Sequence, residues 1–447
     1  MTKNLDKKEF YLLGIFFILV WLPFYLAFFP GVGMHDEIYA SIHPFQSANQ
    51  PIMYNILLSL FYKAGLFFDS HIGGTGAFIF IAMSLTAFAI AFVLIWLNKK
   101  NISKIVLTIL VIYYAFTPII IDYSIAAVKD RAFAVIFLLM IPVLYEITRA
   151  DFKFENKNLW LFFFILSLLM IWVRNNGSYI FIAMVIFVFI MMKESKKIFL
   201  KAAISILFLG MLPGFICGKN FTEAVGVPLQ QICRVVALNK EIPEGERNYI
   251  KNFMPLETIK MQYNERTVDL IKWNPDYNRK FVDNNKFAFA KTWFVLLKMY
   301  PRDYFDAWVF NTQGFWGYLP WGESQSKFGY AYDDEIYLAS NKVGMADGFK
   351  VSQNSILPDG IKSVLGKYVW NYSIFIPSGI CLWLTIAISF ILALQKKYAY
   401  IFVLLPAILC SLTLVVSAPV ANCFRYTFYY VLCLPIYLLL PFMLRKE

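Results

Sequence analysis

The chain has 447 residues, of which 59% are hydrophobic and 16% are charged, and its formal net charge is +12. A soluble domain is nearer half apolar, and the excess here comes in long runs such as residues 10–29, so the composition excludes an ordinary soluble protein. Lys and Arg of membrane proteins collect in loops that stay in the cytoplasm. Because this rule accounts for the positive charge, we expect no nucleic acid partner.

Cysteine and histidine form no recognisable metal-binding pattern. The six cysteines show no CxxC or Cys/His spacing. Cys381, Cys410 and Cys433 lie in apolar runs, where a thiol packs as a small apolar side chain. Three His spread over the whole chain argue against a zinc or haem site built from histidine.

Ten membrane-spanning helices are predicted from the apolar runs. A helix needs about 20 apolar residues to cross the ~30 Å hydrocarbon layer, and the first run has that length. It differs from a cleaved signal peptide, because its core is too long and residues 30–33 are not a small-x-small cleavage site. The predicted spans are residues 10–29, 75–97, 104–121, 131–148, 159–173, 177–192, 197–216, 371–394, 398–417 and 423–444.

The apolar segment 52–68 is predicted to lie along the membrane surface instead of crossing it. It carries Asn55 and Lys63, and counting it as a span would place the basic clusters outside. With both termini inside, the cytoplasmic segments hold 17 basic residues and the short outer loops hold 5, as the positive-inside rule requires. The inner residues are Lys3, Lys7, Lys8, Lys99, Lys100, Lys104, Arg149, Lys153, Lys157, Lys193, Lys196, Lys197, Lys201, Lys396, Lys397, Arg445 and Lys446, and the outer ones are Lys63, Lys129, Arg131, Arg174 and Arg425.

The predicted fold is an all-α polytopic membrane protein in three parts. Residues 1–216 form an N-terminal membrane module of about seven spans, whose first outer loop covers residues 30–74. Residues 217–370 form a mainly helical outer region, and residues 371–447 form a C-terminal module of three spans. Within the outer region, residues 286–300 have helical spacing but are too short and too charged to span.

Two adjacent carboxylates, Asp36 and Glu37, follow the first span directly. Carboxylates at the membrane surface can accept a proton from a hydroxyl group as a general base, or hold a divalent cation such as Mg²⁺ or Mn²⁺. The simpler alternative is that both residues cap a juxtamembrane helix. The same loop offers further polar candidates for binding a sugar or an acceptor, namely His43, Asn49, Gln50 and Tyr54.

A sparse set of basic residues lies on the predicted outer side, where the positive-inside rule disfavours them. Charges at membrane depth are costly and are usually functional or paired, and Arg binds phosphate with a planar fork. The set is therefore predicted to bind the phosphate of a lipid-linked donor, although snorkelling to lipid head groups explains any single member. Its members are Lys129, Arg131, Arg174 and Arg425, with Asn175, Asn176 and Tyr426 beside them.

Aromatic residues are dense in the segment 306–322, where Trp316 is a candidate for stacking on a sugar ring. A membrane-interface aromatic belt is the competing interpretation. The sequence contains no GxSxG, HExxH or Walker A segment. Acidic residues are almost absent from the spans, which weakens a proton-coupled transporter or pump.

The layout resembles the GT-C superfamily of integral membrane glycosyltransferases, in which a long outer loop after the first helix carries an early catalytic acid and juxtamembrane helices. The matching elements are Asp36-Glu37 and the segment Asn49-Gln50-Pro51-Ile52-Met53-Tyr54 before residues 52–68. The short sequence motifs at residues 174–177 and 424–426 are similar to those of bacterial members that are associated with wall polysaccharides. Many members have His-Pro-Pro where this chain has Asn-Gln-Pro, and the resemblance does not extend to residues 217–370.

The resemblance implies an inverting transferase of the bacterial cell membrane that uses a polyprenyl-phosphate sugar. The outer basic residues would hold the donor phosphate, and Asp36 would take a proton from a glycan or lipid-linked acceptor, with Glu37 orienting the site. The main alternative is a transporter or flippase of lipid-linked glycans. A scaffold in a wall-synthesis complex and another type of membrane transferase are further alternatives.

Overall fold

The computed structural model describes residues 2–45, 51–68, 70–217, 221–317, 336–338, 355–371, 377–417, 421 and 423–444. The described chain is almost entirely helical and contains several long apolar helices, as an integral multi-pass membrane protein requires. Within it, six helical segments are long and apolar enough to cross a membrane, and a bent pair raises this number to seven. The six are α1 (Thr2–Ala27), α4 (His71–Lys99), α7 (Lys129–Arg149), α10 (Lys196–Cys217), η4 (Tyr398–Tyr400) with α21 (Ile401–Ser417), and η5 (Phe424–Thr427) with α22 (Tyr429–Tyr437) and α23 (Leu440–Met443).

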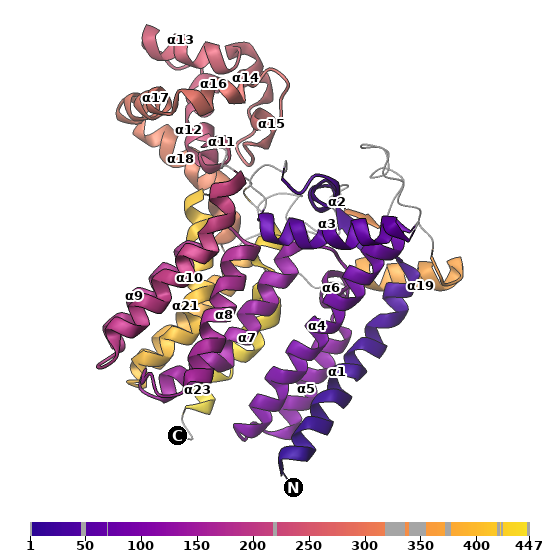
Figure 1. The fold of residues 1–447 in the computed structure, drawn as a ribbon. Coiled ribbons are helices and arrows are strands. Elements are labelled where there is room, and N and C mark those ends of the chain that lie inside the picture. Colours follow the sequence, from indigo (N-terminus) through magenta and orange to yellow (C-terminus); the bar gives the residue numbers. More distant parts are fainter. Residues whose placement is uncertain are drawn as a thin grey trace.

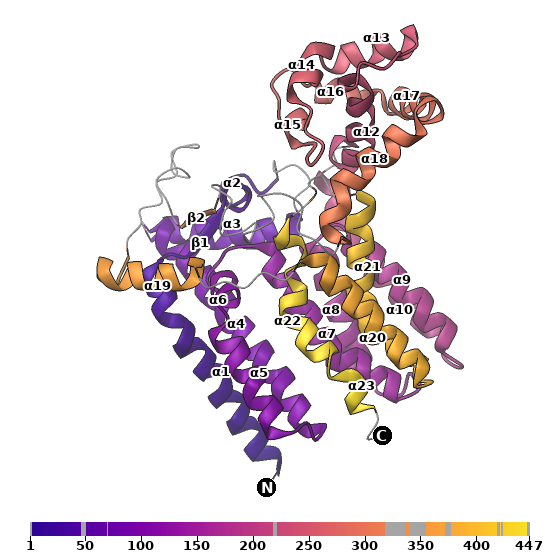
Figure 2. The same ribbon diagram turned by 180° about the vertical axis from the view of Figure 1, so that it is seen from behind.

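Three other predicted spans correspond to shorter apolar helices. They are α8 (Lys157–Val173), α9 (Gly177–Met191) and α20 (Ser378–Leu394), with 17, 15 and 17 residues. All three run alongside the longer helices (Figures 1 and 2). The predicted start of the last of these at residue 371 is wrong, because Pro377 caps α20 and its fixed φ suits the residue before a helix.

The predicted continuous span 104–121 is also wrong in one respect, because it is broken near its C-terminal end. The helices α5 (Lys104–Phe116) and α6 (Pro118–Ser124) are bent by 56° to each other. Pro118 lacks an N–H and disfavours the helical region for the residue before it. Thr117 accordingly takes an extended conformation, with φ −69° and ψ 117°.

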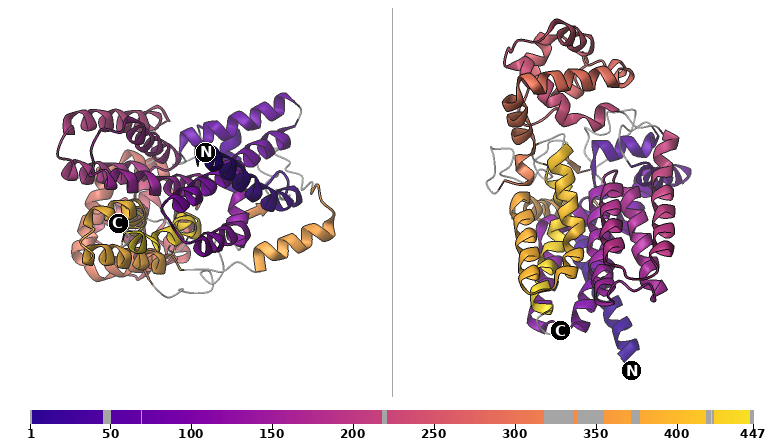
Figure 3. Two further views of the ribbon diagram at one scale, coloured as in Figure 1. Left: turned by 90° about the horizontal axis from the view of Figure 1, so that it is seen from below. Right: turned by 90° about the vertical axis from the view of Figure 1, so that its left-hand side faces the viewer.

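Both termini lie at one end of the helical bundle (Figure 1). The segments that join α4 to α5, α7 to α8, α9 to α10 and α20 to α21 lie at this same end. The predicted cytoplasmic residues between Lys99 and Lys397 lie in these segments or in the adjoining helix turns, and Lys3, Lys7 and Lys8 lie at the start of α1. Arg445 and Lys446 lie outside the described residues. At the opposite end stand the first loop and the outer helices (Figure 3).

The first loop folds into β1 (Val32–Met34), α2 (His35–Ile42) and α3 (Ile52–Phe67). Helix α3, which covers the segment predicted to lie along the membrane surface, runs across the bundle and not parallel to its helices (Figure 1). The all-α prediction misses one small sheet. Strand β2 (Ile336–Leu338) returns to pair antiparallel with β1, with Gly33 opposite Tyr337.

Residues 221–317 form a compact unit, called here the outer helical unit. Its core is separate from that of the bundle and includes Ile232, Val235, Phe253 and Leu296, all 0% exposed. The predicted helix 286–300 is confirmed as α17, and Pro301 occupies the first turn of the next helix. The elements are α11 (Phe221–Ala224), α12 (Gly226–Ala237), α13 (Glu244–Phe253), α14 (Leu256–Gln262), α15 (Asp269–Lys272), α16 (Arg279–Asn284), α17 (Lys286–Met299), α18 (Pro301–Thr312) and η1 (Gln313–Phe315).

The end of the predicted outer region packs on the N-terminal module and not on the outer helical unit. Helix α19 (Asp359–Asn371) lies against α1 and α6. The Ile356 N–H donates to the Leu26 carbonyl at 3.0 Å, and the Tyr368 hydroxyl donates to the Phe116 carbonyl. Among the described residues of the predicted outer region, α19 therefore packs apart from residues 221–317.

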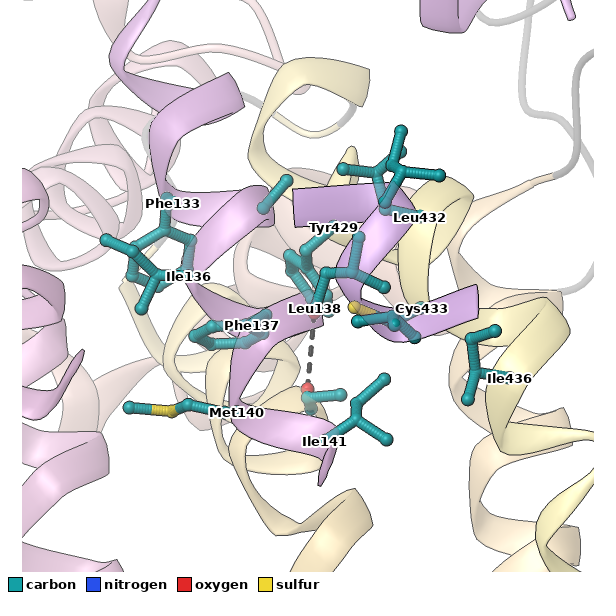
Figure 4. Close-up of a cluster of buried hydrophobic side chains, with 14 of the residues drawn as sticks. Phe133, Ile136, Phe137, Leu138, Met140, Ile141, Tyr429, Leu432, Cys433 and Ile436 are labelled. Atoms are coloured by element: carbon teal, nitrogen blue, oxygen red, sulfur yellow. Dashed lines mark hydrogen bonds between the residues drawn. The ribbon is translucent and has the colours of Figure 1, made fainter. Parts of the chain in front are cut away.

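The centre of the bundle is the contact between α7 and α22, which joins the N-terminal and C-terminal modules. Phe133, Phe137 and Leu138 of α7 interleave with Tyr429 and Cys433 of α22 (Figure 4). The rings of Phe137 and Tyr429 lie 5.0 Å apart. This packing fixes the N-terminus of α7 beside η5, where the charged residues of the candidate site lie.

Candidate functional site

A buried group of charged residues, called here the ionic cluster, lies at the end of the bundle opposite the termini. Three of its members begin α7, where the chain turns from the extended Val128 into the helix. Lys129, Asp130 and Arg131 are only 8%, 2% and 2% exposed. Ionised side chains are almost never buried in this way unless they are paired. The members of the cluster are Glu37, Lys129, Asp130, Arg131, Arg174 and Arg425.

Glu37 joins the first loop to α7. Its Oε1 atom accepts a hydrogen bond from Lys129 Nζ at 3.2 Å, and its side chain is 2% exposed. The ion pair holds α2 against the N-terminus of α7. Because Glu37 is buried and already holds a cation, this geometry favours a positioning role for it over direct contact with an acceptor.

Arg174 is the hub of the cluster and follows the last residue of α8. Its Nη1 atom lies 2.9 Å from Asp130 Oδ1, and the two side chains are 11% and 1% exposed. The same Nη1 atom donates to the Tyr426 carbonyl at 3.3 Å. The guanidinium carbon also lies 4.9 Å from the Tyr426 ring centre and 5.3 Å from that of Phe133. Arg174 thereby connects α7, α8 and η5.

The two remaining cations of the cluster contact backbone and aromatic groups. Arg131 Nη1 donates to the Ser124 carbonyl at the end of α6, 2.9 Å away. Arg425 places its guanidinium carbon 5.2 Å from the ring centre of Tyr426. All four predicted outer basic residues other than Lys63 thus lie together, although they come from three separate parts of the chain.

Tyr54 of α3 lies beside the ionic cluster. Its side chain is 6% exposed, and among the described residues its hydroxyl has no hydrogen-bond partner. Burial raises the pKa of Tyr54, and Arg131 opposes that rise more weakly while Glu37 and Asp130 add to it. The hydroxyl therefore stays protonated and is available as a donor to a bound ligand.

Other predicted site residues are not members of the ionic cluster or lie outside the described residues. The Asn176 side chain forms a hydrogen bond to α21, in which Nδ2 donates to Thr413 Oγ1 at 2.9 Å. Asn175 is exposed. Trp316 donates to Thr312 Oγ1 at 3.1 Å and stacks on Trp308. His43 is half-buried and follows α2 directly, within the first loop. Asn49, Gln50 and the side chain of Asp36 fall outside the described part of the structure.

Two buried acids are absent from the predicted site. Asp130 stands between two basic residues at a predicted membrane end, which is the sequence signal that could have identified it as their partner. Asp122 of α6 is 2% exposed, and its Oδ2 accepts no hydrogen bond from a described residue. It immediately follows the predicted span 104–121, so its burial could not be recognised from the position of the span.

A divalent cation at Asp36 and Glu37 was one expectation from the sequence. In the described ranges, no group of three or more His, Cys, Asp and Glu residues could hold a metal ion. The ammonium of Lys129 occupies one oxygen of Glu37. The named members of the ionic cluster are four cations and two carboxylates.

Fold and site together define a polytopic helical membrane protein with a buried ionic cluster at the end opposite its termini. The chain belongs to DUF6020, described as a family of unknown function, whose family model matches residues 42–447. Comparisons with curated proteins and with solved structures gave no match.

Proposed function

We propose that the protein is a membrane glycosyltransferase with a GT-C-like fold. It moves a sugar from a polyprenyl-phosphate donor to a cell-surface glycan or lipid-linked acceptor on the outer face of a bacterial cell membrane. The observation that supports this most is the ionic cluster, which gathers four cations at one end of a bundle of apolar helices. An amphiphile with a phosphate head and a long apolar tail matches such a site.

The charge balance of the cluster favours an anionic ligand. Its four cations exceed its two carboxylates by two positive charges, and with the carboxylate of Asp36 added one positive charge still remains. Positive charge gathered in a low-dielectric region attracts an anionic group strongly. A phosphate would supply the compensating charge, and Arg131 and Arg425 offer guanidinium groups that can bind it in bidentate geometry.

The topology in this proposal has ten crossings, with α8, α9, α20 and the bent pair α5–α6 among them. An even number of crossings places both termini on one side, as their shared end of the bundle requires. The basic segments at that end make it cytoplasmic under the positive-inside rule. The ionic cluster and the outer helical unit then face the outside.

The reaction in this proposal is a single displacement at the anomeric carbon. The acceptor hydroxyl oxygen attacks, the bond from the anomeric carbon to the phosphate oxygen breaks, and polyprenyl phosphate leaves with inverted stereochemistry at the sugar. Asp36 takes the hydroxyl proton as a general base, which is worth about 10²–10⁴ in rate. Glu37 holds Lys129 in place, and the cations stabilise the charge that develops on the leaving phosphate.

Isosteric substitution of the two acids tests this assignment. Asp36→Asn is expected to lower turnover by at least ~10² while polyprenyl-phosphate binding persists. Glu37→Gln keeps the shape of the side chain but weakens the pair with Lys129, so donor binding should fall as well. A normal rate for the Asp36→Asn protein together with an inactive Glu37→Gln protein that still binds donor would move the base to Glu37. Normal rates for both would remove the base from this loop.

A further inference from the structure

The outer helical unit carries a second group of buried and half-buried polar side chains, called here the outer polar cluster. Gln230 and Arg234 lie four residues apart on α12 and therefore on one face of it. Asp306 of α18 approaches this face, with its Oδ2 3.7 Å from Arg234 Nη2. Phe310, one turn further along α18, has its ring centre 5.2 Å from the Arg234 guanidinium carbon.

The turn after α14 completes the outer polar cluster. The side-chain amide of Gln230 donates to the Asn264 carbonyl, which holds this turn against α12. The neighbouring Tyr263 hydroxyl faces Arg234. Burial raises the pKa of Tyr263 to about 12, so the hydroxyl stays protonated near neutral pH and can donate a hydrogen bond.

The outer polar cluster stands next to the segment that leads into the ionic cluster. The Ala421 N–H donates to the Arg266 carbonyl at 2.7 Å. This bond holds the turn after α14 against Ala421, which precedes Arg425 by four residues in the sequence. Trp308 Nε1 donates to the Val415 carbonyl at 2.9 Å and ties α18 to α21. Phe315 stacks on Tyr426 with ring centres 6.5 Å apart. The outer helical unit is thus anchored directly above η5.

Several polar atoms of this cluster have no hydrogen-bond partner within the described ranges. Gln230 is 0% exposed, yet its Oε1 accepts no hydrogen bond. Arg234 Nε and the Tyr263 hydroxyl meet no strict hydrogen-bond geometry, although the hydroxyl interacts with the Arg234 side chain. Each such buried group costs about 1–3 kcal/mol, and native proteins retain few of them. Here an acceptor, a donor and a hydroxyl that can be either belong to α12 and the turn after α14, and Phe310 contacts Arg234 on the same face of α12.

The polar groups and the aromatic ring of the outer polar cluster indicate which kind of ligand would fit it. The charge of Arg234 is compensated by Asp306, so the site does not favour an anion. Alternating donors and acceptors suit the hydroxyl groups of a sugar, and the ring of Phe310 offers a flat apolar surface for the C–H face of a pyranose. Ligand sites commonly combine apolar walls with a few placed polar groups in this way.

We propose that Gln230, Arg234 and Tyr263 bind a neutral sugar residue of the acceptor glycan, with its ring against Phe310. This inference rests on the proposed transferase function and adds to it the location and charge of the acceptor. The outer helical unit recognises the glycan, and its anchoring on η5 delivers the acceptor to the donor phosphate.

Binding can be measured without any donor. The full-length protein in lipid nanodiscs is applied to an array of neutral and anionic bacterial oligosaccharides. The wild type is expected to bind neutral oligosaccharides, and Arg234→Gln and Tyr263→Phe are each expected to weaken that binding at least tenfold. Tyr263→Phe removes only a hydroxyl that interacts with the Arg234 side chain and leaves the ring in place, so the fold should persist. Arg279→Gln is the matched control, because Arg279 also stacks on an aromatic ring of the outer helical unit, Trp273, at 4.2 Å.

The site is refuted if the wild type binds no neutral oligosaccharide, if it binds anionic ones alone, or if Arg234→Gln and Arg279→Gln bind equally well. Failure of the transferase proposal gives a different result. In that case the wild type binds neutral oligosaccharides through these residues but releases no polyprenyl phosphate when donor is supplied. Activity on an acceptor that is insensitive to Arg234→Gln and Tyr263→Phe would overturn the acceptor site alone.

Discussion

Replacing Arg174 is expected to destabilise the protein strongly, because it strands a buried charge. Asp130 is 1% exposed and has its cation at 2.9 Å. Arg174→Met keeps most of the side-chain volume but leaves this carboxylate without a counter-charge. Removing one partner of a buried ion pair costs about 3–5 kcal/mol. Asp130→Asn in the same chain removes the stranded charge and should restore most of the lost stability.

Thermal unfolding in detergent measures this effect with a thiol-reactive fluorophore. Cys233, Cys381, Cys410 and Cys433 are free and buried, so their labelling reports unfolding. For a loss of this size the unfolding midpoint should fall by about 5–10 °C.

Arg149→Met is the control for this experiment. Arg149 ends α7, the helix that contains Asp130, and its Nη1 lies 3.6 Å from Glu146 Oε2, but its side chain is 57% exposed. Exposed pairs of this kind contribute about 0–1 kcal/mol. Equal midpoints for Arg174→Met and Arg149→Met, or no recovery in the Arg174→Met, Asp130→Asn double variant, would refute the buried-pair argument.

Three further predictions follow from the described geometry. Arg425→Ala should weaken binding of polyprenyl phosphate about 10–100-fold, since a hydrogen bond to a charged group is worth about 1.5–3 kcal/mol. A competition binding assay measures the affinity, with Lys63→Ala on the exposed side of α3 as the control. Equal affinities of the two variants would contradict this prediction. Single cysteines are introduced at Gly245, where a side chain meets nothing within 4 Å, and at Glu155, in a chain without other cysteines. An impermeant maleimide added to intact cells should label Gly245→Cys and should miss Glu155→Cys. The reverse pattern would place the ionic cluster on the cytoplasmic side. Gly177→Ala should lower the unfolding midpoint, because its Cβ would lie 2.4 Å from the Met170 carbonyl oxygen, whereas Gly360→Ala has open space; similar midpoints for the two would show that the turn after α8 can relax.

The membrane helices could be predicted because their signal is local. A run of about 20 apolar residues has few alternatives to a helix across a bilayer, and the break at residues 174–177 was visible as a polar interruption. The bend at Pro118 was missed, although proline is the standard cause of such breaks, because the apolar run continues through it. The packing of α19 on α1 and α6 was also missed, since no local pattern specifies which distant helix an amphipathic segment contacts.

The candidate site was predicted in composition but not in pairing. The positive-inside rule identified Lys129, Arg131, Arg174 and Arg425 as unusual, and the structure brings all four together. The carboxylate partners depend on contacts between residues far apart in the sequence, such as Arg174 with Asp130 and Lys129 with Glu37. The outer polar cluster forms only where α12, α18 and the turn after α14 pack together. The periodicity of apolar residues along the sequence does not specify this packing.

The central proposal is that a sugar leaves its polyprenyl phosphate at the ionic cluster. The most direct test uses proteoliposomes and a polyprenyl-phosphate sugar that carries one isotope in the sugar and another in the lipid. We predict that, when acceptor glycan is added, the sugar label moves to the glycan while the lipid label is recovered as polyprenyl phosphate, and that Asp36→Asn abolishes this separation. If both labels stay in one molecule that appears in the opposite leaflet, the protein is a flippase and the transferase proposal is wrong.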